Sequence, residues 1–295
     1  MAFEPRISIV IPVYNGANYL RDALDSALGQ TYGNFEVLVV NDGSTDGDET
    51  EKIAKSYGSR IRYFYKENGG VASALNFGIK EMAGEYFSWL SHDDVYYPTK
   101  LERQVEILRT LQKDVVLYGD FELMDGRSRA LGMCRLERKI TENPLRAILG
   151  TSIHGCSTLV PKAAFERVGL FNERLRTVQD NDMWVRVYLT GIDFVHIPEV
   201  LIKSRVHPEQ GQLTLGAVNK IETIQFYRWA FEALQGKIRG DARVMLEVLA
   251  DKGINLPLGV LRGSTANSAL CSWREILGYK VRVYLRRISR KMVQR

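Results

Sequence analysis

Long apolar runs are missing from this sequence of 295 residues, and cysteine is scarce. No run approaches the roughly 18 apolar residues that a membrane-spanning helix needs, so we expect no segment that spans a bilayer. The first residues lack the basic, apolar and small-residue parts of a secretory signal, so none is expected. The cysteines are odd in number and widely spaced, which excludes a disulfide framework or a zinc site and is typical of the reducing cytoplasm. They are Cys134, Cys156 and Cys271.

Two phosphate-binding signatures are also absent. The sequence contains neither GxGxxG nor GxxxxGK[ST], which argues against a dinucleotide oxidoreductase and a P-loop enzyme. Internal repeats and low-complexity tracts are missing too. Apolar residues make up 45% and charged residues 25% of the chain, close to the average of soluble globular proteins. A disordered, collagenous or coiled-coil chain is therefore excluded.

The net charge of +5 comes from the carboxy-terminal tail. Residues 273–295 contain eight basic residues and one acidic residue, so they carry +7 and the rest of the chain carries −2. A nucleic-acid partner would need basic residues over a face of the body, so none is expected. Apolar residues recur at helical spacing in the tail. Two interpretations stay open: the tail lies on an anionic membrane surface, or it packs on the body or on a second copy of the chain in a homo-oligomer.

Strand-like and helix-like segments alternate in the first half of the chain. Apolar runs predict strands, and apolar residues at helical spacing predict helices between them. This alternation predicts a mostly parallel sheet with helices on both faces. Beyond it we expect a short helix at 161–168, a helix at 180–190, an extended segment at 194–206 and helices after 216. The expected strands are 7–13, 35–40, 61–65, 85–90 and 115–118, and the expected helices between them are 20–28, 71–82 and 98–108.

Polar clusters stand at three of the predicted strand ends, where parallel sheets bind ligands. They are Tyr14-Asn15, residues 41–44 and residues 91–94. In the last cluster, Asp93 and Asp94 directly follow a buried strand. Carboxylates on such a turn can hold Mg²⁺ or Mn²⁺. The alternative is that one of them caps the helix that follows.

Six motifs occur in one order: PVYN, NDGSTD, NGGVASALN, LSHDD, QDNDMW and RVH. In this order and spacing they resemble glycosyltransferase family 2, over residues 5 to 210. The resemblance implies an α/β GT-A fold in residues 1–212, followed by a helical extension in residues 213–295. It also implies an inverting, metal-dependent enzyme that moves a sugar from a nucleoside diphosphate, by default uridine diphosphate, to a hydroxyl of a glycan or lipid-linked acceptor. Such an enzyme would serve cell-surface polysaccharide synthesis in the cytoplasm, or peripherally on the inner face of the membrane.

The resemblance places the nucleotide base at the first two motifs. Tyr14 would stack on the base, with Pro12 and Asn15 beside it; the alternative is that Tyr14 packs on the first helix. Asp42 would accept a hydrogen bond from the uracil imide, and it is also a common turn residue.

The third motif would form the phosphate side of the nucleotide site. Asn68 and Gly70 belong to this loop, where glycine lets the backbone approach a ligand. The family often has an arginine at the position of Leu75, so one expected phosphate or ribose contact is missing from this chain.

The fourth motif departs from the D-x-D pattern of the family. Ser91 stands where an aspartate usually contacts the ribose, and can replace it only weakly. Asp93 matches the usual ligand of Mn²⁺ or Mg²⁺. Asp94 is expected to cap a helix or to support Asp93, and His92, on the nucleotide side, to position the loop.

The last motif would lie beside the pyrophosphate. His207 would bind the metal or donate a hydrogen bond to the leaving phosphate. Arg205 would neutralise phosphate charge.

The fifth motif would face the acceptor. Asp180 matches the general base that takes the proton of the acceptor hydroxyl. Gln179 replaces a glutamate, so it can hydrogen-bond the acceptor but cannot share a proton. Trp184 would pack in the core or form the floor of the acceptor site. His154, just past a predicted loop, would face the acceptor or be an ordinary loop residue.

Other classes of protein fit the motifs less well. A non-catalytic subunit that binds nucleotide sugars is the main alternative, because Leu75, Ser91 and Gln179 depart from the family pattern. The retention of Asp93 and Asp180 argues against it. A sugar nucleotidyltransferase would open on a glycine-rich motif that residues 11–16 lack. A glycoside hydrolase would leave the nucleotide motifs unexplained.

Overall fold

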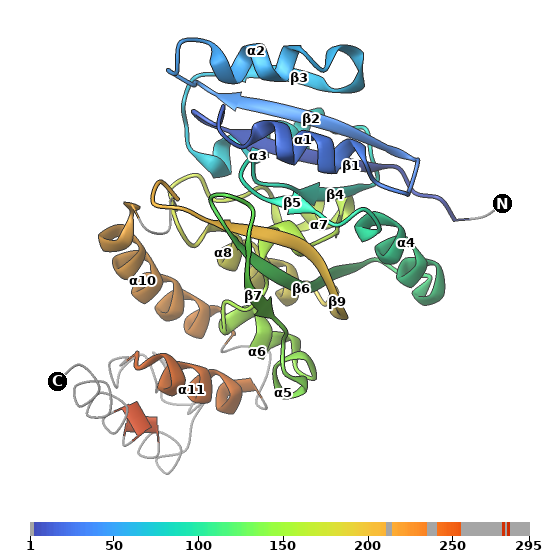
Figure 1. The fold of residues 1–295 in the computed structure, drawn as a ribbon. Helices are drawn as coiled ribbons and strands as arrows, with labels where there is room; N and C mark the ends of the chain where they lie inside the picture. Colours follow the sequence, from blue (N-terminus) through green and yellow to red (C-terminus); the bar gives the residue numbers. More distant parts are fainter. Residues whose placement is uncertain (1–2, 211–213, 235–240, 255–278, 281, 284–295) are drawn as a thin grey trace.

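The computed structural model describes residues 3–210, 214–234, 241–254, 279–280 and 282–283. Its first sheet has five strands in the order β3-β2-β1-β4-β8, and Figure 1 labels all of them except β8. β1 pairs in parallel with β2 and β4, β2 pairs in parallel with β3, and β8 is antiparallel to β4. The mostly parallel α/β architecture predicted from the sequence is therefore confirmed. The bounds are β1 Ile7–Val13, β2 Phe35–Asp42, β3 Arg62–Lys66, β4 Tyr86–Trp89 and β8 Val160–Pro161.

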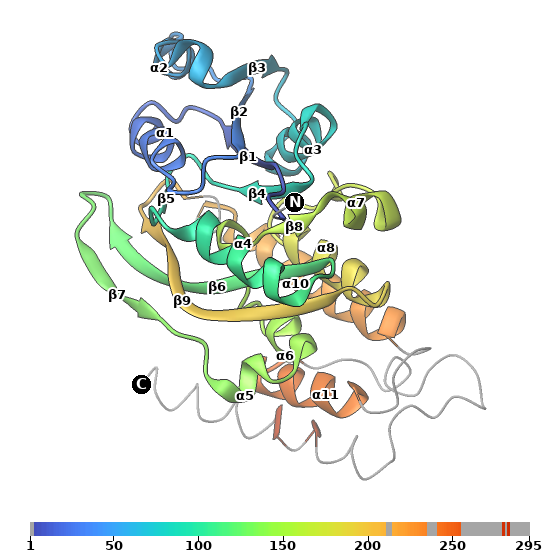
Figure 2. The same cartoon turned by 90° about the vertical axis from the view of Figure 1, so that its right-hand side faces the viewer.

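Helices cover both faces of this sheet. α1 (Leu20–Leu28) and α3 (Val71–Glu81) lie on opposite faces (Figure 2). In α1 the buried residues are Leu20, Ala23, Leu24 and Ala27, one stripe at helical spacing. β1 and β2 are buried almost throughout because helices lie on both sides of them. The short α2 (Glu49–Lys55) and the turn η1 (Gly58–Arg60) lead into β3.

A second sheet, which the sequence did not predict as separate, packs beside the first. Its order is β5-β9-β6-β7, with β6 and β9 parallel and the other pairs antiparallel. The predicted extended segment at 194–206 is β9, which carries the chain back to the residues that follow β4. α4 (Lys100–Leu111) runs between β5 and β6. The strands are β5 Val95–Tyr96, β6 Val115–Asp125, β7 Ala130–Cys134 and β9 Asp193–Val206.

Short helices fill the region between the two sheets and the carboxy-terminal part. The predicted helix at 161–168 is α7, which ends at Gly169 with a φ of 78° that favours glycine. The predicted helix at 180–190 is α8, which carries the buried Trp184 between Phe171 and Phe194. The bounds are α5 Arg138–Thr141, α6 Pro144–Leu149, η2 Gly155–Ser157, α7 Lys162–Val168 and α8 Gln179–Leu189.

Two described helices after β9 pack on the rest of the protein. α10 (Gly216–Leu234) contacts α8, and α11 (Asp241–Lys252) contacts α6. Arg146 of α6 forms an ion pair with Glu247 of α11 at 2.6 Å. The predicted boundary between residues 212 and 213 falls at 211–213, outside the described residues, so it stays a prediction.

Most of the basic tail lies outside the described residues, apart from residues 279, 280, 282 and 283. Of these, Tyr279 and Val283 are buried, and the Tyr279 hydroxyl donates a hydrogen bond to the carbonyl of Ile254 at 2.5 Å. This burial favours packing on the protein for these few residues. Among the described helices, none combines the length and the apolar character needed to cross a membrane.

Candidate functional site

The carboxyl ends of β1, β2 and β4 bring three of the predicted clusters to one edge of the first sheet. The strands lie side by side in parallel, with Val13 opposite Asn41 and Val10 opposite Trp89. Tyr14 follows β1 and is 46% exposed, so its ring is free to meet a ligand rather than packed against α1. Asn15 accepts a hydrogen bond from the Thr45 amide at 2.7 Å and so joins the loops after β1 and β2.

Pro12 has a different place from the one the nucleotide prediction gave it. It is buried inside β1, opposite Val40. Its ring therefore supports the strand and does not face the edge of the sheet. We correct its predicted role from a ligand contact to a supporting position.

Asp42, the last residue of β2, organises residues 68–70, which we name the glycine loop. Its buried carboxylate accepts hydrogen bonds from Lys66 Nζ at 2.7 Å and from the amides of Gly69 and Gly70 at 3.0 and 2.7 Å. A carboxylate has about four acceptor positions, so these bonds leave about one for a ligand. Asp42 thus stabilises the adjacent loop, as expected for a turn residue. The predicted contact with uracil stays a prediction.

The glycine loop lies close to the β2 loop. Asn68 donates from Nδ2 to the carbonyl of Asp42 at 2.9 Å. Gly43 has a φ of 72°, and a Cβ there would lie 2.7 Å from the amide nitrogen of Asn68. Only glycine fits at this position, because a side chain would push the two loops apart. Gly70 also has a positive φ, of 86°, where α3 begins.

Asp93 and His207 form the pair that the metal prediction named. Asp93 follows β4 and His207 follows β9, and Asp93 Oδ2 lies 2.9 Å from His207 Nε2. Both residues are 8% exposed. Neighbouring ligands of an octahedral ion at 2.0–2.1 Å are separated by about 3 Å. The two atoms are hydrogen-bonded to each other in this structure, and a carboxylate and an imidazole are both groups that can bind Mg²⁺ or Mn²⁺, so an ion held by them would replace this hydrogen bond.

Asp94 does not cap a helix, so that interpretation is wrong. α4 begins at Lys100, after Thr99, and Asp94 instead accepts a hydrogen bond from the amide of Arg205 at 2.9 Å. Burial, together with the neighbouring charge of Asp93, raises the pKa of Asp94 to about 8. Asp94 thus fastens β9 to the loop after β4. This agrees with the alternative prediction, in which Asp94 supports Asp93.

Arg205 is buried, which corrects its predicted contact with phosphate. Its guanidinium is 1% exposed and donates to the carbonyl of Asp93 at 2.8 Å and to Asp22 Oδ2 at 2.8 Å. It also donates to Ser128 Oγ at 2.8 Å and lies 4.3 Å from the centre of the Tyr19 ring. These partners occupy the guanidinium, so Arg205 positions the main chain of Asp93.

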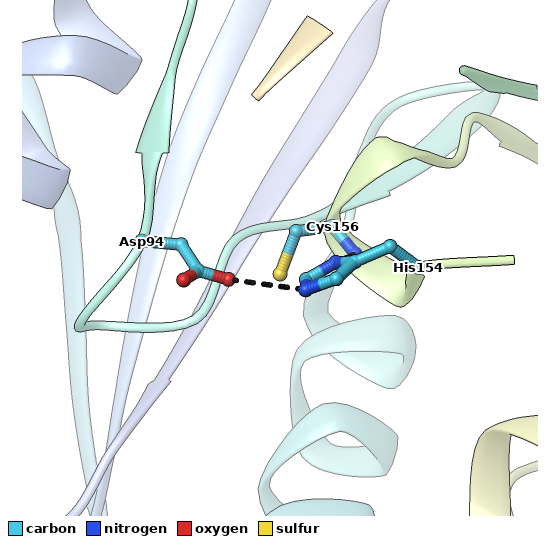
Figure 3. A group of neighbouring side chains, drawn as sticks. All are labelled: Asp94, His154 and Cys156. Carbon is cyan, nitrogen blue, oxygen red and sulfur yellow. Dashed lines mark hydrogen bonds and ion pairs between the residues drawn. The ribbon is translucent and has the colours of Figure 1, made fainter. Parts of the chain in front are cut away.

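Asp94, His154 and Cys156 form a second cluster, with one ligand atom of each within 4.8 Å of the others (Figure 3). His154 Nδ1 accepts from the amide of Cys156 at 3.2 Å, so the proton of the neutral ring is on Nε2. Nε2 lies 3.0 Å from Ser204 Oγ. Burial lowers the pKa of His154 to about 4 and raises that of the Cys156 thiol, so the ring is neutral and the thiol protonated. A protonated nitrogen and a thiol are poor ligands, and we interpret this cluster as a hydrogen-bond network.

This network fixes Ser91 and places His154. The Ser91 amide donates to Cys156 Sγ at 3.2 Å, and the thiol donates to Ser91 Oγ at 3.3 Å. The sequence analysis assigned no role to Cys156, and no short motif marks it. His154 lies beside the loop after β4, at 3.8 Å from Asp94 Oδ2. His92 packs on Gly16, where a Cβ would lie 2.5 Å from the ring, so its position suits the predicted positioning role.

The first turn of α8 holds the predicted base. Asp180 is half-buried, and this burial raises its pKa to about 6, although the amide of Asn181 donates to its carboxylate at 2.8 Å. Gln179 Oε1 is buried and has no hydrogen-bond partner among the described residues. Trp184 is fully buried in the core, so it cannot form the floor of an acceptor site.

Asn76 connects α3 with the segment that leads into α8. Its side-chain amide donates to the carbonyl of Phe171 at 2.9 Å and to Glu173 Oε1 at 2.8 Å, and it accepts from the Phe171 amide at 2.8 Å. The segment that leads into α8 is therefore fastened to α3. Leu75, the neighbouring residue, is fully buried.

Comparisons with known proteins agree with this architecture. The sequence pattern described as glycosyl transferase family 2 matches residues 8–168. Uncharacterized glycosyltransferases of Rickettsia are similar: that of Rickettsia conorii is 52% identical over 74% of this chain and 37% of its own length. That of Rickettsia typhi is 51% identical over 75% of this chain and 69% of its own length. The matched part of the chain thus spans little more than a third of the Rickettsia conorii protein.

Two solved structures share the fold at 18% sequence identity. Residues 1–349 of TarS from S. aureus, in complex with UDP-GlcNAc, align with a TM-score of 0.68 over 83% of this chain and 72% of that one. The mannosyltransferase PcManGT from Pyrobaculum calidifontis, in complex with GDP-Man and Mn²⁺, aligns with a TM-score of 0.58 over 97% of this chain and 88% of that one. These likenesses bear on the fold alone.

Proposed function

Because the chain belongs to glycosyltransferase family 2, we propose that it transfers a sugar from a nucleoside diphosphate to a hydroxyl of an acceptor, with inversion at the anomeric carbon. The Asp93–His207 pair carries this proposal. It joins a carboxylate and an imidazole at the end of β4, on the edge where Tyr14 and the glycine loop also lie. A fold of this type binds ligands at that edge.

The donor would extend from Tyr14 toward Asp93. The exposed ring of Tyr14 offers a face on which a base can stack, and Asp42 has an acceptor position left for the base. We propose uridine diphosphate as the nucleotide. The TarS structure contains UDP-GlcNAc and the PcManGT structure contains GDP-Man, so guanosine diphosphate is the competing donor to test.

Asp93 and His207 would hold a divalent ion, Mn²⁺ or Mg²⁺, in place of the hydrogen bond that joins them at 2.9 Å. When bound, such an ion neutralises negative charge on the departing diphosphate. Arg205 and Asp94 keep Asp93 in place, Arg205 through the Asp93 carbonyl and Asp94 through the Arg205 amide. The chain's own contribution at this point is orientation of the carboxylate.

Asp180 would act as the general base. Its pKa of about 6 leaves it ionised at neutral pH and still basic enough to accept the hydroxyl proton as the oxygen attacks the anomeric carbon. No covalent intermediate is needed for inversion, and Asp180 keeps the proton until it exchanges with solvent. Gln179 stands next to it and would hydrogen-bond the acceptor once its buried Oε1, which has no partner among the described residues, becomes accessible.

We further propose a glycan or lipid-linked acceptor in cell-surface polysaccharide synthesis, on the cytoplasmic side of the membrane. The basic tail supports this because eight positive charges suit an anionic lipid surface.

Thermal unfolding with nucleotides tests the donor site. The protein is heated with UDP, GDP and thymidine diphosphate, each with Mn²⁺ and with EDTA. A nucleotide at 100 times its Kd adds about 2.7 kcal/mol to the free energy of unfolding, and so raises Tm. We expect one nucleotide to raise Tm with Mn²⁺ and less so with EDTA. If none of them raises Tm under either condition, the donor proposal is wrong.

A further inference from the structure

Arg176 is a cation beside the glycine loop, and none of the residues that the structure describes pairs with its charge. A Cβ placed on Gly70 would lie 3.5 Å from Cζ and 3.6 Å from Nε of Arg176, so the guanidinium lies against the backbone of that loop. Arg176 is exposed, and within the described part of the chain no side chain or carbonyl accepts a hydrogen bond from its guanidinium. Its position therefore does not come from an ion pair.

Hydrogen bonds to the main chain hold Arg176 in place instead. The carboxylate of Glu222, buried in α10, accepts from the Arg176 amide at 2.9 and 3.1 Å and from the Thr177 amide at 2.9 Å. The Thr177 hydroxyl donates to the same carboxylate at 2.7 Å. Asn76 fastens the chain a few residues earlier, at Phe171. The backbone is fixed at both points, while the guanidinium has no hydrogen-bond partner in the described ranges.

The surroundings of the guanidinium favour an anion. α3 begins at Val71, directly after Gly70, and a helix N-terminus carries a partial positive charge. Lys66 lies nearby, and the carboxylate of Asp42 compensates its positive charge. The same carboxylate accepts hydrogen bonds from the backbone amides of Gly69 and Gly70. The charge of Arg176 has no such compensation. An anion placed between this arginine and the start of α3 would be attracted by both.

We propose that Arg176 binds the diphosphate of the nucleotide donor. This inference rests on the proposed function, in which a nucleoside diphosphate lies along the same edge of the sheet. The diphosphate is the anionic part of such a donor, and a guanidinium can bind two of its oxygens at once. Leu75 of α3 is fully buried and uncharged, so the cation beside the start of α3 comes from a different segment of the chain. It also stands four residues before Asp180, so one segment carries a donor contact and the base.

Isothermal titration at fixed Mn²⁺ tests this assignment with Arg176→Gln and Arg176→Lys. The matched control is Arg167→Gln, which removes the same charge from an exposed arginine on α7. The probes are UDP, GDP, uridine and inorganic pyrophosphate. We expect Arg176→Gln to weaken binding of the nucleoside diphosphate at least tenfold and that of pyrophosphate similarly. Uridine should bind equally to all variants, and Arg176→Lys should recover part of the affinity. Thermal unfolding without ligand checks that each variant is folded.

The outcomes separate this inference from the proposed function. If the native protein binds UDP or GDP and Arg176→Gln binds it equally well, the role of Arg176 is wrong and the donor site stands. If pyrophosphate binds through Arg176 but no nucleoside diphosphate does so more tightly, the anion site stands and the proposed function is wrong. If neither nucleotides nor pyrophosphate bind the native protein, both are wrong.

Discussion

At the residue scale, two carboxylates of the site differ in what surrounds them. The carboxylate of Asp93 forms a hydrogen bond of 2.9 Å with the imidazole of His207. Asp180 has no cationic partner among the residues that the structure describes, and burial raises its pKa to about 6. The same side chain is thereby suited to binding a metal in one place and to accepting a proton in the other.

Asp180→Asn should lower sugar transfer by about 10²- to 10⁴-fold, because the amide cannot accept the hydroxyl proton. Nucleotide binding, measured by titration calorimetry, should stay within about twofold of the native value. Asp182→Asn is the control, since Asp182 lies on the same helix but pairs with Arg186 at 2.8 Å. Native turnover by Asp180→Asn would show that another group is the base.

The pH dependence follows from the same carboxylate. A base with a raised pKa is protonated, and inactive, below that pKa. We expect kcat/KM to fall as the pH drops, with a midpoint near the pKa of about 6. A profile measured from pH 4.5 to 8 checks this. A flat profile across this range would contradict the assignment.

Asp93→Ala should remove the effect of Mn²⁺ on nucleotide binding, because the remaining imidazole lacks the carboxylate that hard cations prefer. The measurement is the Kd of the nucleotide with and without Mn²⁺. Asp193→Ala, which removes an exposed carboxylate paired with Lys113, is the control. An unchanged ratio of the two Kd values in Asp93→Ala would rule Asp93 out as a ligand.

At the scale of elements, α4 is fastened to the first sheet by a buried lysine. Lys100 Nζ donates to Ser88 Oγ at 2.8 Å and to the carbonyl of Thr158 at 3.2 Å, and burial lowers its pKa to about 7. In the unfolded chain the pKa of Lys100 is near 10.5. At a pH between these two pKa values, Lys100 therefore takes up a proton when the protein unfolds. The free energy of unfolding should therefore rise with pH in this window, by at most about 1.4 kcal/mol per pH unit from this group.

Lys100→Met tests that contribution, because methionine fills a similar volume without a charge. We expect the free energy of unfolding to change less between pH 7 and pH 9 than in the native protein, whatever the offset from the lost hydrogen bonds. Urea unfolding at the two pH values measures the difference. An equal pH dependence in both proteins would contradict a neutral buried lysine.

The contact between α3 and the segment leading into α8 depends on Asn76. Asn76→Ala would leave the buried amide and carbonyl of Phe171 without these partners, so we expect a loss of about 1–3 kcal/mol in the free energy of unfolding. Asn172→Ala is the control, because the exposed side chain of Asn172 accepts, among the described residues, only from the nearby Arg174 amide. Urea unfolding of both variants should separate them by at least about 1 kcal/mol.

At the scale of the whole molecule, the positive charge of the tail can be tested for a role in binding membranes. If residues 274–295 bind anionic lipid, their deletion should abolish sedimentation with liposomes that contain phosphatidylglycerol, and high salt should weaken it in the full chain. Neutral liposomes serve as the control. Sedimentation that survives the deletion would leave packing on the protein as the role of the tail, which the burial of Tyr279 and Val283 already favours for that stretch.

The sequence by itself determined the parallel sheet and the helices on its faces, because apolar spacing within each segment dictates which surface is buried. It also singled out Asp93, Asp180 and His207, because these residues stand in short motifs. Contacts between distant segments were decided by the tertiary structure alone. The burial of Arg205, the thiol of Cys156 beside Ser91, and the guanidinium of Arg176 over Gly70 all join residues at least 65 positions apart. No local pattern encodes such contacts, because they form only when β9, the turn η2 and the segment before α8 pack against the loops at the end of the first sheet.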